Sequence, residues 1–265
     1  MLIAFDIGNT NTVIGVYDGD KALAHWRIGS DRHKTADEYG LIVSQLFHLA
    51  KLHMREVTEA IISSVVPDIT GNLEKMIEKY LHVTPLIVGA GIKTGLMIRY
   101  ENPKEVGADR IVNAVAGIEK YGAPLVLVDF GTATTFCAVN DKAEYLGGAI
   151  VPGVDLSMQA LFANTAKLPK VELTAPKSYI GRNTTNAIQS GLIYGYCDLV
   201  DGMVKRFCEE MGYDWLSGGS LQRVENGESY RSVFDLGRVK NIGEIKFSGE
   251  GEIKCWMCVC WGQAG

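Results

Sequence analysis

Two hydrophobic periodicities alternate along most of the chain. Short apolar runs bounded by glycine, proline or aspartate predict strands over residues 2–6, 12–17, 59–66, 84–88 and 124–129. Apolar residues spaced three and four apart predict helices over 36–52, 68–81, 107–120 and 187–208. Because the strands alternate with helices, the pattern predicts an α/β fold.

One short motif occurs twice, at the start of the chain and near its middle. Asp6-Ile-Gly-Asn-Thr-Asn-Thr12 aligns without a gap on Asp129-Phe-Gly-Thr-Ala-Thr-Thr135, and the same alignment pairs Val16 with Val139. Each copy follows an apolar run and precedes another predicted strand. The repeat predicts two copies of one α/β unit, with domains at 1–117 and 118–214. Chance similarity of two hairpins is the alternative, because turns favour these residue types.

The paired turns have the residues that a polyphosphate needs. Gly8 and Gly131 allow close approach of the backbone, and neighbouring threonines add hydroxyl donors. Asp6 and Asp129, at the strand ends, can hold Mg²⁺ that bridges phosphate oxygens, directly or through water. A single Asp-x-Gly turn is usually plain hairpin chemistry, so the prediction of a nucleotide site depends on the pair. The chain has neither a Walker A sequence nor a Gly-x-Gly-x-x-Gly fingerprint after a strand.

A candidate general base lies at the start of the helix predicted over 107–120. Transfer of a phosphoryl group to an alcohol needs a group that accepts the hydroxyl proton, and Asp109 is suited to this. Taken alone, Asp109 is equally a first-turn acid that complements the helix dipole. Arg110 is suited to pair with a substrate carboxylate, or is a solvated helix residue.

Eight segments keep a recognisable order and spacing: Asp6–Asn11, Ser63–Pro67, Tyr100–Pro103, Gly107–Arg110, Asp129–Thr134, Gly147–Gly153, Gly181–Thr184 and Gln189–Gly191. With these segments, over residues 1–213, the chain resembles the acetate and sugar kinase, heat-shock chaperone and actin superfamily, and within it the type III pantothenate kinases. The turns alone indicate only the superfamily. Gly107-Ala-Asp-Arg110 is the mark of the family.

The resemblance implies a duplicated actin-like (ribonuclease H-like) fold with a nucleotide cleft between two domains. It implies ATP-dependent phosphorylation of pantothenate to 4'-phosphopantothenate, the first step of coenzyme A biosynthesis, in a homodimer. Asp109 becomes the catalytic base, and Asp129 is associated with a monovalent cation, K⁺ or NH₄⁺. Asp6 keeps the Mg²⁺ role that its place at a strand end suggests, directly or through water. The implied substrate-binding residues are Tyr100, Gly107, Ala108, Asp109, Arg110 and Thr184, although Thr184 also suits a helix N-cap. The implied nucleotide-binding residues are Asp6, Ile7, Gly8, Asn9, Thr10, Asn11, Thr12, Val13, Gly131 and Thr132.

Composition excludes several other classes of function. The formal net charge is −5 and no block of lysine or arginine occurs, which argues against binding of a nucleic-acid backbone. The longest apolar runs have the length of strands, so no membrane span is predicted. Met1 leads directly into a strand without a basic segment, which predicts a cytoplasmic location. The five histidines lack metal-ligand spacing and are predicted to lie on the surface.

The resemblance ends near Trp215, and residues 215–265 form a divergent tail. Three interpretations remain open: a frame-shifted C-terminus, a genuine lineage feature, and a metal site at Cys255, Cys258 and Cys260, although structural zinc usually takes four ligands. The tail also keeps two other functions open. One is a catalytically impaired nucleotide-binding or regulatory homologue, and the other is a kinase of the same superfamily that acts on a different small molecule.

Overall fold

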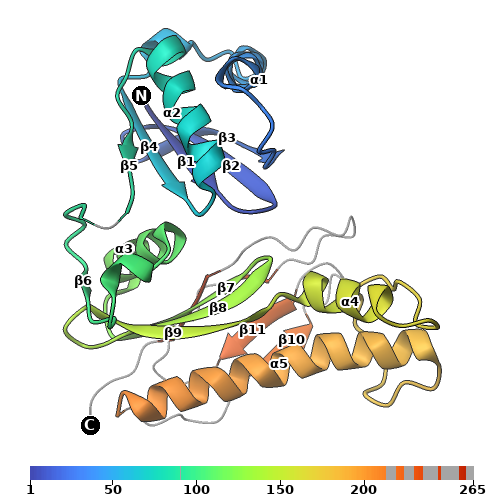
Figure 1. The fold of residues 1–265 in the computed structure, drawn as a ribbon. Coiled ribbons are helices and arrows are strands. Elements are labelled where there is room, and N and C mark those ends of the chain that lie inside the picture. Colours follow the sequence, from blue (N-terminus) through green and yellow to red (C-terminus); the bar gives the residue numbers. More distant parts are fainter. Residues whose placement is uncertain (90, 213–218, 224–229, 235–243, 246–256, 261–265) are drawn as a thin grey trace. The chain divides into compact units, whose positions relative to one another are not determined.

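The computed structural model describes residues 1–89, 91–212, 219–223, 230–234, 244–245 and 257–260. The chain forms two compact units (Figure 1). Unit 1 comprises residues 1–94 and 102–112, and unit 2 comprises 95–101 and the described residues from 113 onward. Helix α3 (Ala108–Tyr121) contributes to both units. The domain boundaries expected from the sequence, at 117 and 214, stay predictions.

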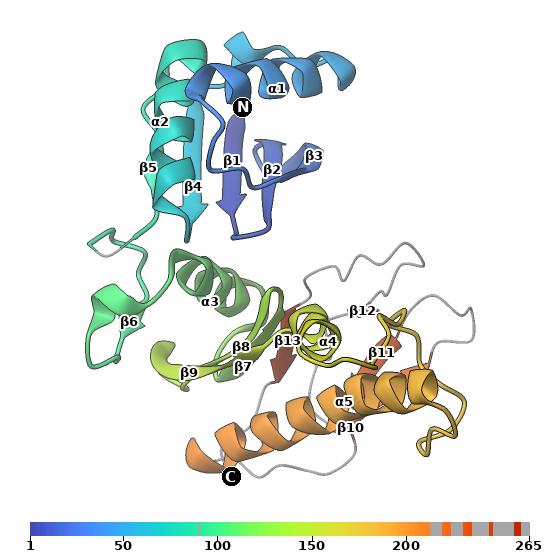
Figure 2. The ribbon, with the colours of Figure 1, turned by 45° about the vertical axis from the view of Figure 1, so that its right-hand side comes forward.

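The sheet of unit 1 begins with an antiparallel hairpin and continues with parallel strands (Figure 2). Its strands are β1 (Leu2–Ile7), β2 (Asn11–Asp18), β3 (Lys21–Gly29), β4 (Glu59–Ser64) and β5 (Leu86–Ile87), in the order β3-β2-β1-β4-β5. Strand β4 runs parallel to β1, which places the end of β4 beside the turn that follows β1.

One face of this sheet forms the core of unit 1 together with helices α1 (Ala36–Leu49) and α2 (Pro67–Leu81). Along β1 the side chains of Ile3, Phe5 and Ile7 are buried, whereas Asp6 points to the other face and is exposed. This alternation is the period of two that a half-buried strand requires. It directs the Asp6 carboxylate away from the core at the end of the strand.

The main sheet of unit 2 repeats the same opening hairpin. Its strands are β6 (Met97–Ile98), β7 (Leu125–Phe130), β8 (Ala133–Val139), β9 (Glu144–Pro152) and β13 (Met257–Cys260), in the order β13-β7-β8-β9-β6. Strands β7, β8 and β9 are antiparallel neighbours, as are β1, β2 and β3. The second neighbour of the first hairpin strand differs between the units: β4 is parallel to β1, whereas β13 is antiparallel to β7.

Strand β7 is buried on both faces, which explains its continuous apolar run. Val126 and Val128 pack against Val200 and Val204 of helix α5 (Thr184–Glu210). On the opposite face, a Cβ built at Gly117 of α3 would lie 2.9 Å from the Leu127 side chain. The glycine therefore lets α3 approach the strand closely.

Three further features complete the described fold. Helix α4 (Val154–Ala163), which no pattern predicted, follows β9 directly. Two short 3₁₀ turns occupy Met54–Glu56 and Pro103–Glu105. A separate small sheet contains β10 (Gly219–Arg223), β11 (Tyr230–Phe234) and β12 (Glu244–Ile245).

The repeated hairpin in two mixed sheets confirms the duplicated actin-like α/β fold. The nucleotide cleft expected between the halves stays a prediction. So do the three interpretations of the tail, because the side chains from 213 onward, including those of the three clustered cysteines, lie outside the described residues. The five histidines are exposed, as expected. Among the described residues, no helix is both long and apolar enough to cross a membrane.

Candidate functional site

The first turn, residues 8–11, is tightly closed at the end of the β1–β2 hairpin. The Gly8 N–H donates to Asn11 O at 3.0 Å, and a Cβ at Gly8 would lie only 3.2 Å from that same oxygen. Glycine therefore suits the position sterically. Asn9, Thr10 and Asn11 are exposed at the tip. The turn thus presents backbone and side-chain polar groups to solvent, as a phosphate-binding loop would.

Strand register corrects the gapless alignment of the two turns. Ile7 pairs with Thr12 in the first hairpin, whereas Phe130 pairs with Thr134 in the second. Thr134, and not Thr135, is therefore the counterpart of Thr12, and the side chains of both are fully buried. Four residues separate the paired positions in the first hairpin and three in the second. The correction also makes Thr132 the counterpart of Thr10 and Ala138 that of Val16, because the second turn is one residue shorter.

Asp109 lies in the first turn of α3, as predicted. Its Oδ1 accepts the N–H of Arg110 at 2.9 Å, and the N–H groups of Arg110 and Ile111 donate to Gly107 O. A Cβ at Gly107 would overlap Asp109 Oδ1. Gly107 therefore allows the carboxylate to fold back over the helix start, which fixes its orientation and leaves it half-buried.

A chain of contacts within unit 1 links the Asp109 loop to the first turn. A Cβ at Gly107 would lie 3.6 Å from Cγ1 of Val65, and the Val65 N–H donates to Ile7 O at 3.1 Å. Ile7 directly precedes Gly8. The loop after β4 therefore lies beside the backbone next to the candidate base and is hydrogen-bonded to the residue before the candidate phosphate-binding turn. The family segment Ser63–Pro67 contains this connecting residue.

The second turn is held by the residue that follows β9. Gly131 N–H donates to Ala133 O at 3.1 Å, and Gly153 N–H donates to Thr132 O at 2.9 Å. A Cβ at Gly153 would overlap the carbonyl oxygens of Gly131 and Thr132, so only glycine fits there without movement. Next to the turn, Asn113 Nδ2 donates to Asp129 Oδ2 at 3.3 Å, which orients that carboxylate.

Tyr100 lies in unit 2 against strand β9. Its ring would be 3.5 Å from a Cβ at Gly147, whose φ of +142° also favours glycine. The preceding residue anchors it, because Arg99 N–H donates to Tyr145 O at 2.8 Å. The Arg99 guanidinium also pairs with Glu144 at 2.6 Å. This hydrogen bond lowers the pKa of the Glu144 carboxyl, which keeps the pair charged.

Thr184 is the first residue of α5 and is exposed, but it is not the N-cap. Asn183 caps the helix, since its Oδ1 accepts the N–H of Asn186 at 2.8 Å. The N-cap role suggested for Thr184 is therefore wrong by one residue. The side chain of Thr184 is not committed to capping, which leaves it suited to contact a ligand.

Each of the two turns has one carboxylate beside it, which suits a metal ion that takes most of its other ligands from phosphate and water. Asp6 is exposed at a strand end, and Asp129 is half-exposed beside its turn. Within the described ranges, no group of three or more His, Cys, Asp and Glu side chains could cage a metal ion. Mg²⁺ commonly binds through one or two carboxylates plus substrate phosphates, so single carboxylates suit it.

Sequence patterns missed several residues that hold these turns. Val65, Asn113 and Gly153 act through contacts with residues distant in the sequence. Ser30, the residue after β3, was also missed. The gapless repeat alignment, extended beyond the turn, pairs Ser30 with Gly153 and could have drawn attention to both.

Comparison with known proteins identifies one family. A family model described as type III pantothenate kinase matches residues 2–206. Among solved structures, similarity extends to a protein from Campylobacter jejuni described as a Baf family transcriptional activator. It has 17% identity and a TM-score of 0.48, over 76% of this chain and 78% of that one.

Two further solved structures are similar to this chain. A protein from Sinorhizobium meliloti described as a 2-dehydro-3-deoxygalactonokinase has 13% identity and a TM-score of 0.47, over 80% of this chain and 88% of that one. The ethanolamine utilization protein EutJ from Carboxydothermus hydrogenoformans has 15% identity and a TM-score of 0.42, over 78% and 71%. At these scores, the structural likenesses add nothing to a functional assignment.

Proposed function

The chain belongs to the type III pantothenate kinase family, and from that premise we propose that it transfers the γ-phosphoryl group of ATP to the primary hydroxyl of pantothenate. The observation that carries the proposal is the link within unit 1 from Asp109 through Gly107 and Val65 to the first turn. It joins a proton acceptor to a loop suited to phosphate.

In the proposed reaction, Asp109 accepts the proton of the pantothenate hydroxyl through its carboxylate. The hydroxyl oxygen then forms a bond to the γ-phosphorus, and the bond from that phosphorus to the β,γ-bridging oxygen breaks. The electron pair leaves with ADP. Because Asp109 Oδ1 already accepts the Arg110 N–H, Oδ2 is the oxygen that we assign to the proton.

The phosphates of ATP would be held by the two turns. Residues 6–13 contribute the first turn with its flanking strand ends, and Gly131 and Thr132 contribute the second. Asp6 would hold Mg²⁺, directly or through water, and Asp129 would hold K⁺ or NH₄⁺. Such cations neutralise charge on the phosphates when bound. Asn113 supports the second assignment, because its amide donates a hydrogen bond that orients the Asp129 carboxylate beside the turn.

Pantothenate carries a carboxylate at one end and a primary hydroxyl at the other. Arg110 would pair with the carboxylate, since a guanidinium binds carboxylates in a bidentate manner. Gly107 and Ala108 would line the substrate beside the base. Tyr100 and Thr184 would contribute from unit 2. We further propose that the enzyme is a cytoplasmic homodimer, as the family resemblance implies.

The test is an ADP-release assay with pantothenate, ATP, Mg²⁺ and K⁺, run on the wild type beside Asp109→Asn. We expect turnover to fall by at least ~100-fold in the variant, the usual size of a general-base effect. Asparagine is a matched replacement, because its Oδ1 can still accept the Arg110 N–H and preserve the helix start. Near-normal turnover in a folded variant would exclude Asp109 as the base.

The same assay separates the alternatives. Robust turnover of another small alcohol or acid, with none of pantothenate, would support a different kinase of the superfamily. Nucleotide binding without acceptor-dependent ADP release would support a catalytically impaired homologue. Omitting K⁺ or Mg²⁺ in turn tests the two cation assignments, and sedimentation of the purified chain tests the dimer.

A further inference from the structure

Ser30 contacts the first turn at three points. Its N–H donates to Thr10 O at 2.9 Å, its Oγ donates to Gly8 O at 2.7 Å, and its Oγ also lies 2.8 Å from Thr12 Oγ1. Ser30 directly follows β3, so it comes from outside the hairpin that carries the turn. One half-buried residue therefore contacts Gly8, Thr10 and Thr12, which are the first, third and last residues of the segment 8–12.

These contacts determine which way the peptide groups of the turn point. In a trans peptide the C=O and the following N–H point in opposite directions. Because Gly8 O points to Ser30, the N–H of Asn9 points away from Ser30; the same reasoning applies to Thr10 O and the N–H of Asn11. Ser30 thus holds two carbonyls toward itself and turns the adjacent amides to the opposite side of the turn, which is the orientation that an anion on that side would require.

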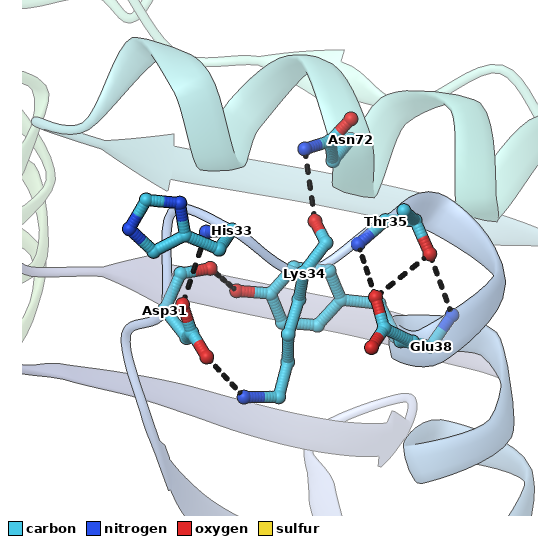
Figure 3. Close-up of polar contacts among 7 residues, drawn as sticks. Asp31, His33, Lys34, Thr35, Glu38 and Asn72 are labelled. Atoms are coloured by element: carbon cyan, nitrogen blue, oxygen red, sulfur yellow. Dashed lines mark hydrogen bonds and ion pairs between the residues drawn. The ribbon is translucent and has the colours of Figure 1, made fainter.

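Ser30 is itself part of a segment, residues 30–35, that hydrogen bonds tie to the core of unit 1. The backbone oxygen of Asp31 accepts the hydroxyl of Tyr39, a fully buried residue of α1, at 2.9 Å. Asn72 Nδ2 of α2 donates to Lys34 O at 3.0 Å, and Figure 3 shows this side chain reaching down to the segment. Both helices therefore restrain the residues that follow Ser30.

Contacts within the segment hold its own shape (Figure 3). The Asp31 carboxylate accepts from Lys34 Nζ at 2.7 Å and from the His33 N–H at 3.0 Å, and the Lys34 hydrogen bond lowers the pKa of Asp31. Thr35 and Glu38 form a capping box that begins α1. The segment therefore connects the turn to the hydrophobic core.

We infer that Ser30 is a positioning residue for ATP binding. It holds the first turn in the conformation that receives the phosphates and does not need to touch them. The inference rests on the proposed function, because it assumes that the first turn binds nucleotide phosphate. An exposed turn that is already ordered binds its ligand without the entropic cost of ordering at the moment of binding. Replacing Ser30 should therefore weaken ATP binding and leave pantothenate binding unchanged.

The experiment compares Ser30→Ala, Ser30→Thr and a control, Ser44→Ala, on the wild-type full chain. Ser44 is an exposed serine of α1 and lies outside the proposed site. For Ser30→Ala we expect KM for ATP to rise about tenfold, the effect of losing roughly one net hydrogen bond, with KM for pantothenate unchanged. Ser30→Thr keeps the hydroxyl and should recover most of the loss, and Ser44→Ala should match the wild type.

Hydrogen exchange followed by mass spectrometry gives a second measurement that needs no ligand. In Ser30→Ala we expect faster exchange of the amides in residues 8–12, with no change in α2. If Ser30→Ala does not fold, Ser30→Cys is the second variant, because a thiol is close in size to the hydroxyl but only a weak hydrogen-bond donor and acceptor. Its expected rise in KM for ATP is about threefold.

An unchanged KM for ATP, or an equal rise in KM for both substrates, would overturn the inference. So would unchanged exchange in residues 8–12. Titration of the wild type with Mg²⁺-ATP and no acceptor separates this failure from failure of the proposed function. If the wild type binds nucleotide and Ser30→Ala binds it equally well, the inference alone is wrong; if the wild type binds none, the proposed function is wrong.

Discussion

In both units, the residue that follows the last strand of the antiparallel trio, β3 in unit 1 and β9 in unit 2, donates its backbone N–H to a threonine carbonyl in the turn. Ser30 donates to Thr10 O and Gly153 donates to Thr132 O, each at 2.9 Å. Beyond that shared bond the two positions differ. The Ser30 side chain adds contacts to Gly8 and Thr12, whereas a side chain at Gly153 would overlap the turn itself.

The difference follows from the length of the two turns. The longer first turn leaves room for a hydroxyl, while the shorter second turn brings backbone against backbone. The chain after the third strand differs in the same sense: residues 30–35 separate β3 from α1, but α4 begins immediately after Gly153. A duplicated fold has thus kept one backbone hydrogen bond and stabilised its two turns differently, one by a side chain and one by close contact.

The largest effect is expected at Gly153. Gly153→Ala should destabilise unit 2 by about 3 kcal/mol, because the new Cβ would overlap two carbonyl oxygens that cannot move independently. Urea unfolding and hydrogen exchange of β8 and β9 measure this. Gly191→Ala in α5 is the matched control: nothing lies within 4 Å of its Cβ position, so it should stabilise the helix by up to about 1 kcal/mol. Equal effects of the two changes would contradict the close contact.

Replacing each of the two buried threonines by valine should change the free energy of unfolding differently. Thr12→Val removes a hydroxyl that contacts Ser30 Oγ and should cost about 1 kcal/mol. Thr134 Oγ1 is buried and has no hydrogen-bond partner among the described residues, so Thr134→Val should be neutral or stabilise by up to about 1 kcal/mol. Local exchange in each hairpin measures both. A loss of stability in Thr134→Val would show that this hydroxyl has a partner in solution.

The smallest effect on stability is expected at Arg32. Its Nη2 lies 3.4 Å from Asn9 Oδ1, but both side chains are exposed. Arg32→Ala should therefore change the free energy of unfolding by less than about 0.5 kcal/mol. Chemical denaturation beside Ser30→Ala makes the comparison directly. If Arg32→Ala lowered the free energy of unfolding as much as Ser30→Ala, the turn would be held at its tip by Arg32 and not at its strand ends by Ser30.

Local pattern in the sequence was enough to predict most of the elements that carry the candidate site. The short apolar run over residues 2–6 predicted β1 with Asp6 near its end, and helical spacing after Gly107 predicted α3 with Asp109 in its first turn. Helix α4 was missed, and Thr184 was assigned a cap that Asn183 provides. Helix starts are hard to place from sequence, because neighbouring polar residues are nearly equivalent as caps.

By itself, the sequence determined the alternation of strands and helices, the repeat of the Asp-x-Gly turn and the family signature, because each is written in residues close together in the chain. Only the tertiary structure decided that Thr134 is the counterpart of Thr12, that Val65 joins Asp109 to the first turn, and that Ser30 and Gly153 occupy equivalent positions. The physical reason is that strand register and close backbone contacts depend on residues far apart in the sequence, and no local pattern records which of them meet.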